Sequence, residues 1–340
     1  MKKVLKMTAI IILSITAILV IVWFTDLGGI KTKVYVNRIV KMRVSPKRLS
    51  NPKNPSDYGM NYKSVDIITA DKVRLSAWEI PAQTKSNKTI ILNHPLTCTK
   101  YGSVEGLDGV SVEFLPMVKY LHENGYNVVM YDHRGQGDSY GGFGKTAQGC
   151  EAPVGAGVTE WQDVIASVNY VNNHPEYKND KIALLSQCMG ANATFLAWNK
   201  RPQIFNNSNI KCLVAIQPTI SYNMIDRMIK IKTKMDLVDA VEAKQKEQFG
   251  FGFAQSLTDI KSLTVPVLFT QVRKDQYTYD VETRKNDIEQ ILASCPTEKE
   301  MIWIGSKEAK PFGTDKRFDG YGYFNQYPEE LLNFLNKHMN

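Results

Sequence analysis

The chain has 340 residues, of which 43% are hydrophobic, so it can build the core of one large domain and does not have the composition of a disordered protein. The net charge of +8 lies almost entirely at the start, because residues 1–50 contain ten Lys or Arg residues and one acidic residue, Asp26. The other 290 residues contain 32 basic and 33 acidic side chains. This balance predicts no basic face for nucleic acid, and we expect no nucleic-acid partner.

An uninterrupted apolar run over residues 7–24 has 18 residues and is just long enough to span a bilayer. Three lysines precede it, and neither an A-x-A-like cleavage site nor a lipobox cysteine follows. We therefore predict an uncleaved signal anchor over residues 1–30 that forms a single-pass transmembrane helix; a cleaved signal peptide is the alternative. The lysines before the run favour an extracytoplasmic domain, although basic residues also follow it. Residues 31–60 form a basic linker that could lie on anionic headgroups.

From residue 63 onward, patterns typical of strands alternate with patterns typical of helices. Strands are predicted at 64–69, 73–80, 89–93, 127–131, 181–185, 211–216, 265–270 and 300–304. Helices are predicted at 112–124, 161–173, 191–200, 279–293 and 328–338. The first two strands should form a hairpin, and the alternation of the rest predicts an α/β domain over residues 61–340, with a mostly parallel eight-stranded sheet and helices on both faces.

The segment between the strands at 211–216 and 265–270 is too long for a plain crossover, and we interpret residues 218–262 as an inserted helical cap. Met224, Ile225, Met228 and Ile229 alternate with basic residues and predict an amphipathic helix. Its apolar face could pack on the core of the domain. The alternative is a lid that contacts membrane lipid or an acyl chain.

The segment Ser186-Gln187-Cys188-Met189-Gly190 follows a predicted strand and opens a predicted helix. A small-x-nucleophile-x-small sequence at such a junction is typical of a nucleophile elbow, where the turn lifts the central side chain clear of the sheet. Cys188 is therefore the predicted nucleophile. A cysteine is partly thiolate at neutral pH, and the N-terminus of the following helix favours that anion, so it needs less activation than a serine.

Together with two further motifs, this elbow resembles the α/β-hydrolase superfamily over about residues 60–340. Residues 125–139 look like the D-x-R-G-x-G-x-S loop after the fourth strand of that superfamily, and residues 91–96 lie where its oxyanion strand would be. The resemblance implies that Asp132 and Arg134 brace loops. It also implies an oxyanion hole made by the backbone amides of Leu96 and Met189.

The resemblance places the acid of the site after the seventh strand, where Asp275 is our choice and Asp280 the second. The expected His should follow the last strand, but residues 305–324 contain no His. His94 and His133 end strands on the active face and are the possible substitute bases, although roles in ordering loops are favoured for both. His338, in the final helix, is not favoured as a base.

Five cysteines are present, without a C-x-x-C motif, so we predict neither a metal site nor a cofactor. Cys98 and Cys150 could pair if the domain is exported. We predict an α/β-hydrolase that acts on small-molecule esters or acyl thioesters through Cys188. The second hypothesis is a catalytically degenerate binding module of the same fold at the cell envelope, and the missing His favours it.

Overall fold

The computed structural model describes residues 2–41, 51–103, 111–140, 155–305 and 316–340. The chain divides into two compact units. The first combines residues 1–43 with residues 229–252, and the second combines residues 44–228 with residues 253–340. The functional residues proposed from the sequence all belong to the second unit, within the predicted hydrolase domain.

The first unit is helical and contains the start of the chain together with part of the predicted cap. Its elements are α1 (Lys2–Thr25), η1 (Leu27–Gly29), α2 (Ile30–Lys41) and α8 (Val238–Phe249). Helix α2 packs on α8 and buries Val36. Within the described residues, no helix combines the length and the apolar character needed to cross a membrane. The transmembrane helix predicted over residues 1–30 is therefore not found.

The second unit is built on a sheet in which eight of the described strands pair in the order β1-β2-β4-β3-β5-β6-β7-β10. Strands β1 and β2 are antiparallel to their neighbours, and the other pairings are parallel, as the sequence predicts. The strands are β1 (Lys63–Ile68), β2 (Arg74–Ile80), β3 (Lys88–Asn93), β4 (Asn127–Tyr131), β5 (Lys181–Gln187), β6 (Ile210–Ile216), β7 (Val267–Val272) and β10 (Lys299–Ile304).

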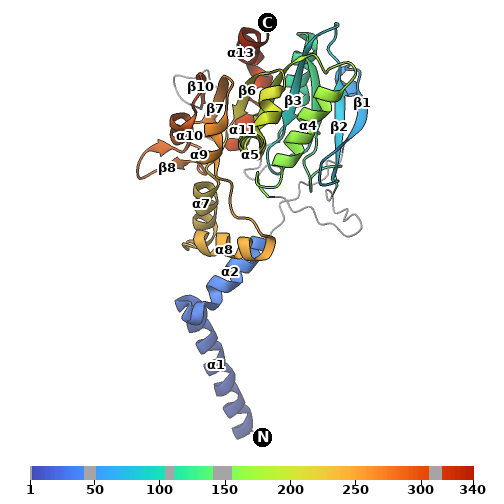
Figure 1. The fold of residues 1–340 in the computed structure, drawn as a ribbon. Helices are drawn as coiled ribbons and strands as arrows, with labels where there is room; N and C mark the ends of the chain where they lie inside the picture. Colours follow the sequence, from blue (N-terminus) through green and yellow to red (C-terminus); the bar gives the residue numbers. More distant parts are fainter. Residues whose placement is uncertain (1, 42–50, 104–110, 141–154, 306–315) are drawn as a thin grey trace. The chain divides into compact units, whose positions relative to one another are not determined.

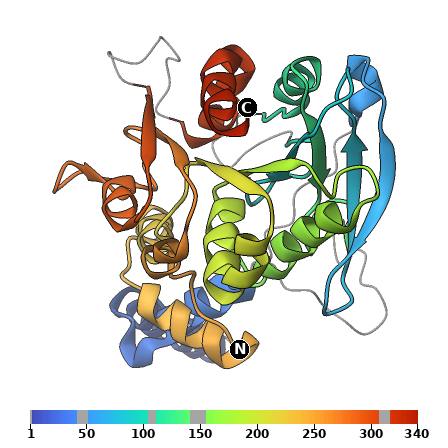
Figure 2. The same ribbon diagram turned by 45° about the horizontal axis from the view of Figure 1, so that its top comes forward.

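Helices cover both faces of this sheet (Figures 1 and 2). One face carries α3 (Leu115–Glu123), α11 (Arg317–Tyr321), α12 (Tyr323–Gln326) and α13 (Pro328–Met339). The other carries α4 (Trp161–Asn173), α5 (Met189–Lys200), α6 (Pro202–Asn207), η3 (Ile260–Ser262) and α10 (Ile288–Ser294). The remaining elements are η2 (Pro55–Tyr58), α7 (Ser221–Thr233), α9 (Ser256–Asp259) and the short pair β8 (Tyr279–Asp280) and β9 (Lys285–Asn286).

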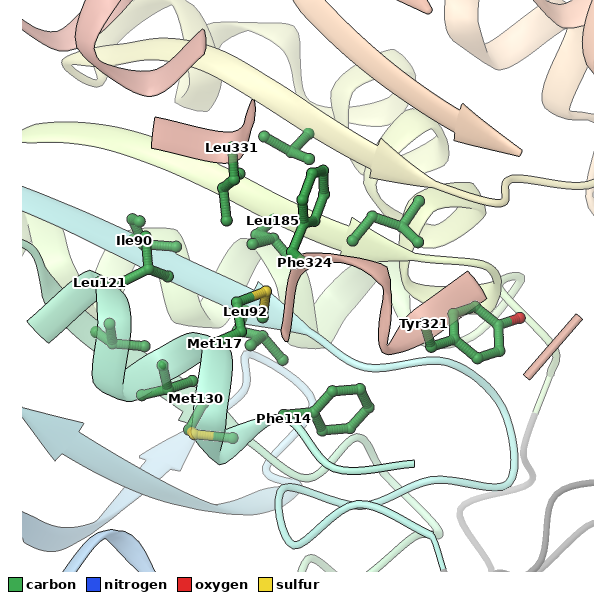
Figure 3. Close-up of a cluster of buried hydrophobic side chains, with 14 of the residues drawn as sticks. Ile90, Leu92, Phe114, Met117, Leu121, Met130, Leu185, Tyr321, Phe324 and Leu331 are labelled. Atoms are coloured by element: carbon green, nitrogen blue, oxygen red, sulfur yellow. The ribbon is translucent and has the colours of Figure 1, made fainter. Parts of the chain in front are cut away.

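The central strands are apolar on both faces because each face has its own core. Ile90 and Leu92 of β3 point into the core shared with α3 and α13, whereas Ile91 points into the core shared with α4 and α5. All three are fully buried, and each contributes about 1.5–3 kcal/mol through the apolar surface removed from water. Figure 3 shows Ile90 and Leu92 with Leu121, Leu185 and Phe324 in the first core. These two cores fix the sheet on which the candidate site stands.

One predicted helix is wrong over most of its length. We expected a helix at 279–293, but Tyr279 and Asp280 pair with Lys285 and Asn286 as a small antiparallel ladder, and only Ile288–Ser294 is helical. Asp280 explains the difference, because its carboxylate accepts hydrogen bonds from the backbone amides of Glu282 and Thr283 and closes a turn. The segment at 218–262 contains helices, as predicted, namely α7, α8 and α9.

Candidate active site

Cys188 joins β5 to α5 with a strained backbone. Its φ of 48° and ψ of −108° lie outside the regions that L-residues ordinarily adopt. The backbone amide of Cys188 donates a 2.8 Å hydrogen bond to the carbonyl of Ile216 on the neighbouring strand, which holds the turn in place. Strain of this kind persists where the surrounding structure enforces it, and it is concentrated at functional sites. The side chain is 6% exposed.

The two small residues that flank the elbow have different roles. A Cβ on Gly190 would lie 2.5 Å from the carbonyl oxygen of Asn93, so only glycine lets α5 approach β3 this closely. Ser186 is small but bonded: its Oγ accepts from Nδ2 of Asn93 at 2.8 Å and lies 2.9 Å from Oγ1 of Thr194. The elbow is thereby tied to the strand beside it and to its own helix.

The two backbone amides predicted to form an oxyanion hole lie in suitable local structures. Met189 is the first residue of α5, where an amide has no acceptor within its own helix. Leu96 is the second residue of a turn that the amide of Cys98 closes on the carbonyl of Pro95 at 3.3 Å, and Thr97 supplies the positive φ of 70°. The turn's own hydrogen bond therefore does not use the amide of Leu96.

Asp275 follows β7, as predicted, and is fully buried. One carboxylate oxygen accepts from the amide of Tyr277 at 3.0 Å, and the other accepts from the hydroxyl of Thr278 at 3.1 Å. That second oxygen also pairs with Nη1 of Arg317 at 2.5 Å. The partner of the acid is therefore an arginine, in the segment after β10 where the resemblance leads us to expect a histidine.

Arg317 begins α11 and is 4% exposed. Its Nη2 donates to the carbonyl of Gln217, and the side-chain amide of Gln217 donates back to the carbonyl of Arg317. Gln217 directly follows Ile216, whose carbonyl accepts the amide of Cys188, so the guanidinium lies beside the elbow. A Cβ on Gly320 would lie 2.5 Å from Nε2 of Gln217, so a larger residue at position 320 would displace the side chain that bonds the carbonyl of Arg317.

The charge of Arg317 is stabilised by its neighbours although the residue is buried. Burial opposes the charge, but interactions with Tyr321, Cys188 and Asp275, and a side-chain hydrogen bond with Cys188, outweigh it and raise the pKa of Arg317 well above its usual value. Burial also raises the pKa of Tyr321 well above its usual value. The centroid of the Tyr321 ring lies 5.8 Å from Cζ of Arg317. The site therefore contains a fixed positive charge in contact with the predicted nucleophile.

Arg317 was not anticipated from the sequence. The resemblance predicts a histidine after the last predicted strand, and an arginine among the lysines of that segment carries no local signal of burial. The available signal is its position, one, four and seven residues before the aromatic residues Phe318, Tyr321 and Phe324, which pack into the core.

The two histidines considered as substitute bases are engaged with neighbouring loops. Nδ1 of His94 lies 2.8 Å from the carbonyl of Pro95, and Nε2 accepts from the amide of His133 at 3.0 Å. Nδ1 of His133 lies 3.3 Å from Asp163. Burial is the main cause that lowers the pKa of His94 to about 3 and that of His133 to about 4. Their described hydrogen bonds favour the loop-ordering roles, and His338, in α13, packs its ring on Phe334.

The loop after β4 is braced by buried ion pairs, which agrees with the roles implied for Asp132 and Arg134. Nε of Arg134 pairs with Asp163 at 2.7 Å, and Nη1 pairs with Asp71 at 2.7 Å. Asp132 pairs at 2.6 Å with Lys100, a lysine only 1% exposed. Sequence reasoning missed Lys100, because lysine is seldom fully buried without a partner.

In the described part of the chain, the residues grouped closely enough to hold a metal ion are Glu298, Glu300 and His338. Nζ of Lys337 already bonds both carboxylates at 2.7 Å, so an ammonium group occupies that position. Cys98 is a free and fully buried thiol, and Cys150 lies outside the described residues.

Comparison with known proteins supports the fold that the geometry defines. Residues 103–244 match the family described as serine aminopeptidase, S33. The Escherichia coli K12 protein YfhR is 28% identical over 132 residues, which is 38% of each chain, so the match spans less than half of that relative.

Two solved structures align with most of this chain. The esterase Pf2001 of Pyrococcus furiosus has a TM-score of 0.61 at 23% identity, covering 88% of this chain and 99% of that one. The alpha/beta hydrolase GrgF of Penicillium sp. sh18 has a TM-score of 0.53 at 18% identity, covering 82% and 99%. The chain therefore has the fold of the α/β-hydrolase superfamily. The S33 description names a serine enzyme, whereas this chain has Cys188 at the elbow.

Proposed function

We propose that this protein cleaves ester or thioester bonds of small molecules through an acyl-enzyme formed on Cys188. The observation that carries the proposal is the backbone of Cys188, held at a φ of 48° on a strand–turn–helix junction that requires glycine at position 190. A junction with this strain and this packing presents its central side chain at the carboxyl edge of the sheet. The hydrolase fold of the chain supports the same class of reaction.

In the proposed reaction the sulfur of Cys188 attacks the carbonyl carbon of the substrate, and the oxygen becomes negatively charged. The amides of Leu96 and Met189 are the proposed donors to that oxygen. The tetrahedral intermediate then collapses, and the leaving group departs with the bonding electron pair. A thiolate or an activated phenolate departs without a proton, whereas an alkoxide needs one. Thioesters and activated esters are therefore the favoured substrates.

The test uses the full-length protein with p-nitrophenyl acetate and with an acetyl thioester. We expect a burst of released product equal to the enzyme concentration, together with an acetyl group on Cys188 by peptide mass spectrometry. Cys188→Ala should abolish both, and Cys212→Ala, which changes a buried cysteine of β6, should leave both unchanged. A burst that survives Cys188→Ala would contradict the proposal.

The second candidate is a binding module that has lost its reaction. The arginine in the place of the expected histidine favours it, since Arg317 is held by Asp275 and cannot act as a base at neutral pH. This candidate predicts no burst and no acetylation of Cys188 with either substrate. The same experiment therefore decides between the two.

Membrane anchoring at the cell envelope is a separate proposal that rests on the apolar run of residues 7–24 and its flanking lysines. We expect the protein to stay with the membrane fraction after extraction at alkaline pH. Release into the supernatant would contradict it, without consequence for the chemistry of Cys188.

A further inference from the structure

We propose that the guanidinium of Arg317 stabilises negative charge on the sulfur of Cys188 but cannot activate water, so that the site exchanges acyl groups between thiols instead of hydrolysing them. This inference rests on the proposed acyl-enzyme and names both its substrate class, acyl thioesters, and the class of acceptor, a second thiol. The side chain of Arg317 has no part in the reaction as described above.

The guanidinium of Arg317 is fixed from two sides. Asp275 accepts from Nη1, and the carbonyl of Gln217 accepts from Nη2. The backbone of Arg317 is fixed as well, because its carbonyl accepts from the side chain of Gln217. A planar guanidinium held by several acceptors keeps one orientation, so its charge remains directed at the elbow beside it.

Among the described residues, the titratable groups that interact with Cys188 include Arg317 and Tyr321 of α11 and Cys98, which follows β3. Asp275, which follows β7, interacts with the guanidinium of Arg317. Burial raises the pKa of Cys98 well above its usual value and keeps that thiol neutral, and Tyr321 is likewise neutral. The carboxylate of Asp275 is paired with the guanidinium. In the described part of the site, Arg317 and the N-terminus of α5 are therefore the groups that favour negative charge on an attacking sulfur.

An arginine differs from a histidine in what it can do after acylation. A histidine takes the proton of an attacking water, whereas arginine is protonated throughout the accessible pH range and has no acceptor atom. Water that attacks the acyl-enzyme would therefore have to lose its proton to solvent. An acceptor that arrives as an anion has no proton to lose.

The exchange balances without an external acid or base. The thiolate of Cys188 attacks the acyl thioester, forms a new C–S bond, and expels the first thiolate with its electron pair. A second thiolate attacks the same carbonyl carbon, and Cys188 leaves as the thiolate with which the cycle began. In each half one C–S bond forms and one breaks, and the leaving thiolate takes the electron pair of the broken bond, so no proton is transferred in the exchange itself.

The first experiment measures the reactivity of Cys188 without any substrate. Full-length protein is treated with iodoacetamide between pH 5 and pH 9, and labelling of Cys188 is followed by peptide mass spectrometry. Arg317→Gln should slow labelling at pH 7 at least tenfold, and Arg317→Lys should restore part of the rate. Arg201→Gln, which changes an exposed arginine after α5, is the matched control and should label as the wild type does.

Circular dichroism and thermal unfolding of each variant show whether it is folded at the labelling temperature. If folded Arg317→Gln labels at the wild-type rate, the guanidinium does not promote the reactivity of the Cys188 sulfur and the inference is overturned. If Arg317→Gln does not fold, the comparison between Arg317→Lys and wild type decides, since the inference requires a slower rate with the lysine than with the arginine.

The second experiment measures where the acyl group goes. Wild-type protein is given an acetyl thioester with and without N-acetylcysteamine as acceptor, and acetyl transfer is compared with release of acetate. We expect transfer to exceed hydrolysis at least tenfold. Arg317→His places a base between Asp275 and Cys188 and should raise the rate of hydrolysis relative to transfer.

The two experiments separate failure of this inference from failure of the proposed function. Acetylation of Cys188 followed by rapid hydrolysis in the wild type overturns the exchange reaction and leaves the acyl-enzyme standing. Fast iodoacetamide labelling that depends on Arg317, with no acetylation by any thioester, overturns both the proposed function and the exchange reaction. Only the effect of Arg317 on the reactivity of Cys188 would then remain.

Discussion

Two buried arginine–aspartate pairs lie at the carboxyl edge of the sheet, and their surroundings differ. Arg134 pairs with Asp163 and Asp71 in a set that includes His133, which we call the bracing cluster. Arg317 pairs with Asp275 in a set that includes Gln217 and Cys188, which we call the site cluster. The chemistry of the pairs is the same. They differ in the residues around them. The hydrogen bonds of the bracing cluster join loops to α4, whereas the guanidinium of the site cluster also contacts Cys188, which has a strained backbone.

The difference shows how a structural interaction becomes available to chemistry. An arginine that is buried and paired has a fixed position. In the bracing cluster this fixed position stabilises the fold, and in the site cluster it directs a positive charge at Cys188. If this interpretation is correct, changes in the bracing cluster should alter stability alone, and changes in the site cluster should alter stability and the reactivity of Cys188 together.

The largest effect is expected for Asp163→Ala in the bracing cluster. It leaves the buried side chain of Arg134 with Asp71 alone and removes a hydrogen bond to the amide of Arg134. Breaking a buried pair by removing one partner costs about 3–5 kcal/mol. Urea unfolding measures the loss, and Asp66→Ala, which removes the exposed partner of Arg74, should cost less than about 1 kcal/mol. Slower iodoacetamide labelling of folded Asp163→Ala would remove the distinction between the clusters.

An intermediate effect is expected for Asp275→Asn in the site cluster. The amide keeps the shape of the side chain but weakens the bonds to Arg317, and the free energy of unfolding should fall by about 2 kcal/mol. Labelling of Cys188 should slow several-fold because the guanidinium loses its anchor. Asp287→Asn is the matched control, since Asp287 forms a similar pair with Arg227 at 2.6 Å, and it should lower stability without slowing the label.

The smallest effect is a loss of stability in mild acid that originates in His133 of the bracing cluster and in His94, whose Nε2 accepts from the amide of His133. His133, with a pKa of about 4, and His94, with a pKa of about 3, are neutral when folded and bind protons near pH 6.5 when unfolded. Stability from these residues is complete above pH 6.5 and decreases as the pH falls. Below about pH 6 the raised pKa values of Asp163, about 6, and of Glu160 act in the opposite direction.

We therefore expect a net loss of about 1 kcal/mol between pH 7 and pH 5, measured by urea unfolding at each pH. His94→Gln should make this dependence shallower, whatever its effect on stability at pH 7. Arg317→Lys should leave it unchanged, because the described part of the site cluster contains no histidine. If the pH dependence of stability disappears in Arg317→Lys but persists in His94→Gln, it originates in the site cluster and not in the two histidines.

The sequence is a good guide to the sheet and a partial guide to the site. The strands predicted at 127–131 and 181–185, the elbow at 188 and the position of Asp275 follow from local patterns. Apolar runs, a strand–turn–helix junction and a loop after a strand can all be recognised over a few residues. The helix predicted at 279–293 failed because a side-chain-closed turn at Asp280 outweighed the apolar spacing. Arg317 and Lys100 could not be found locally, since their burial depends on partners 42 and 32 residues away.

The position of Arg317 also has a consequence for the history of this fold. Codons for arginine and histidine can differ by a single base, and Asp275 is placed to hold either side chain by an N–H donor. If the exchange reaction proposed above is correct, one nucleotide change at codon 317 could convert a site that transfers acyl groups into one that hydrolyses them, or the reverse. A hydrolase, which uses water as the acceptor, and an acyl transferase, which excludes it, would then differ by one nucleotide.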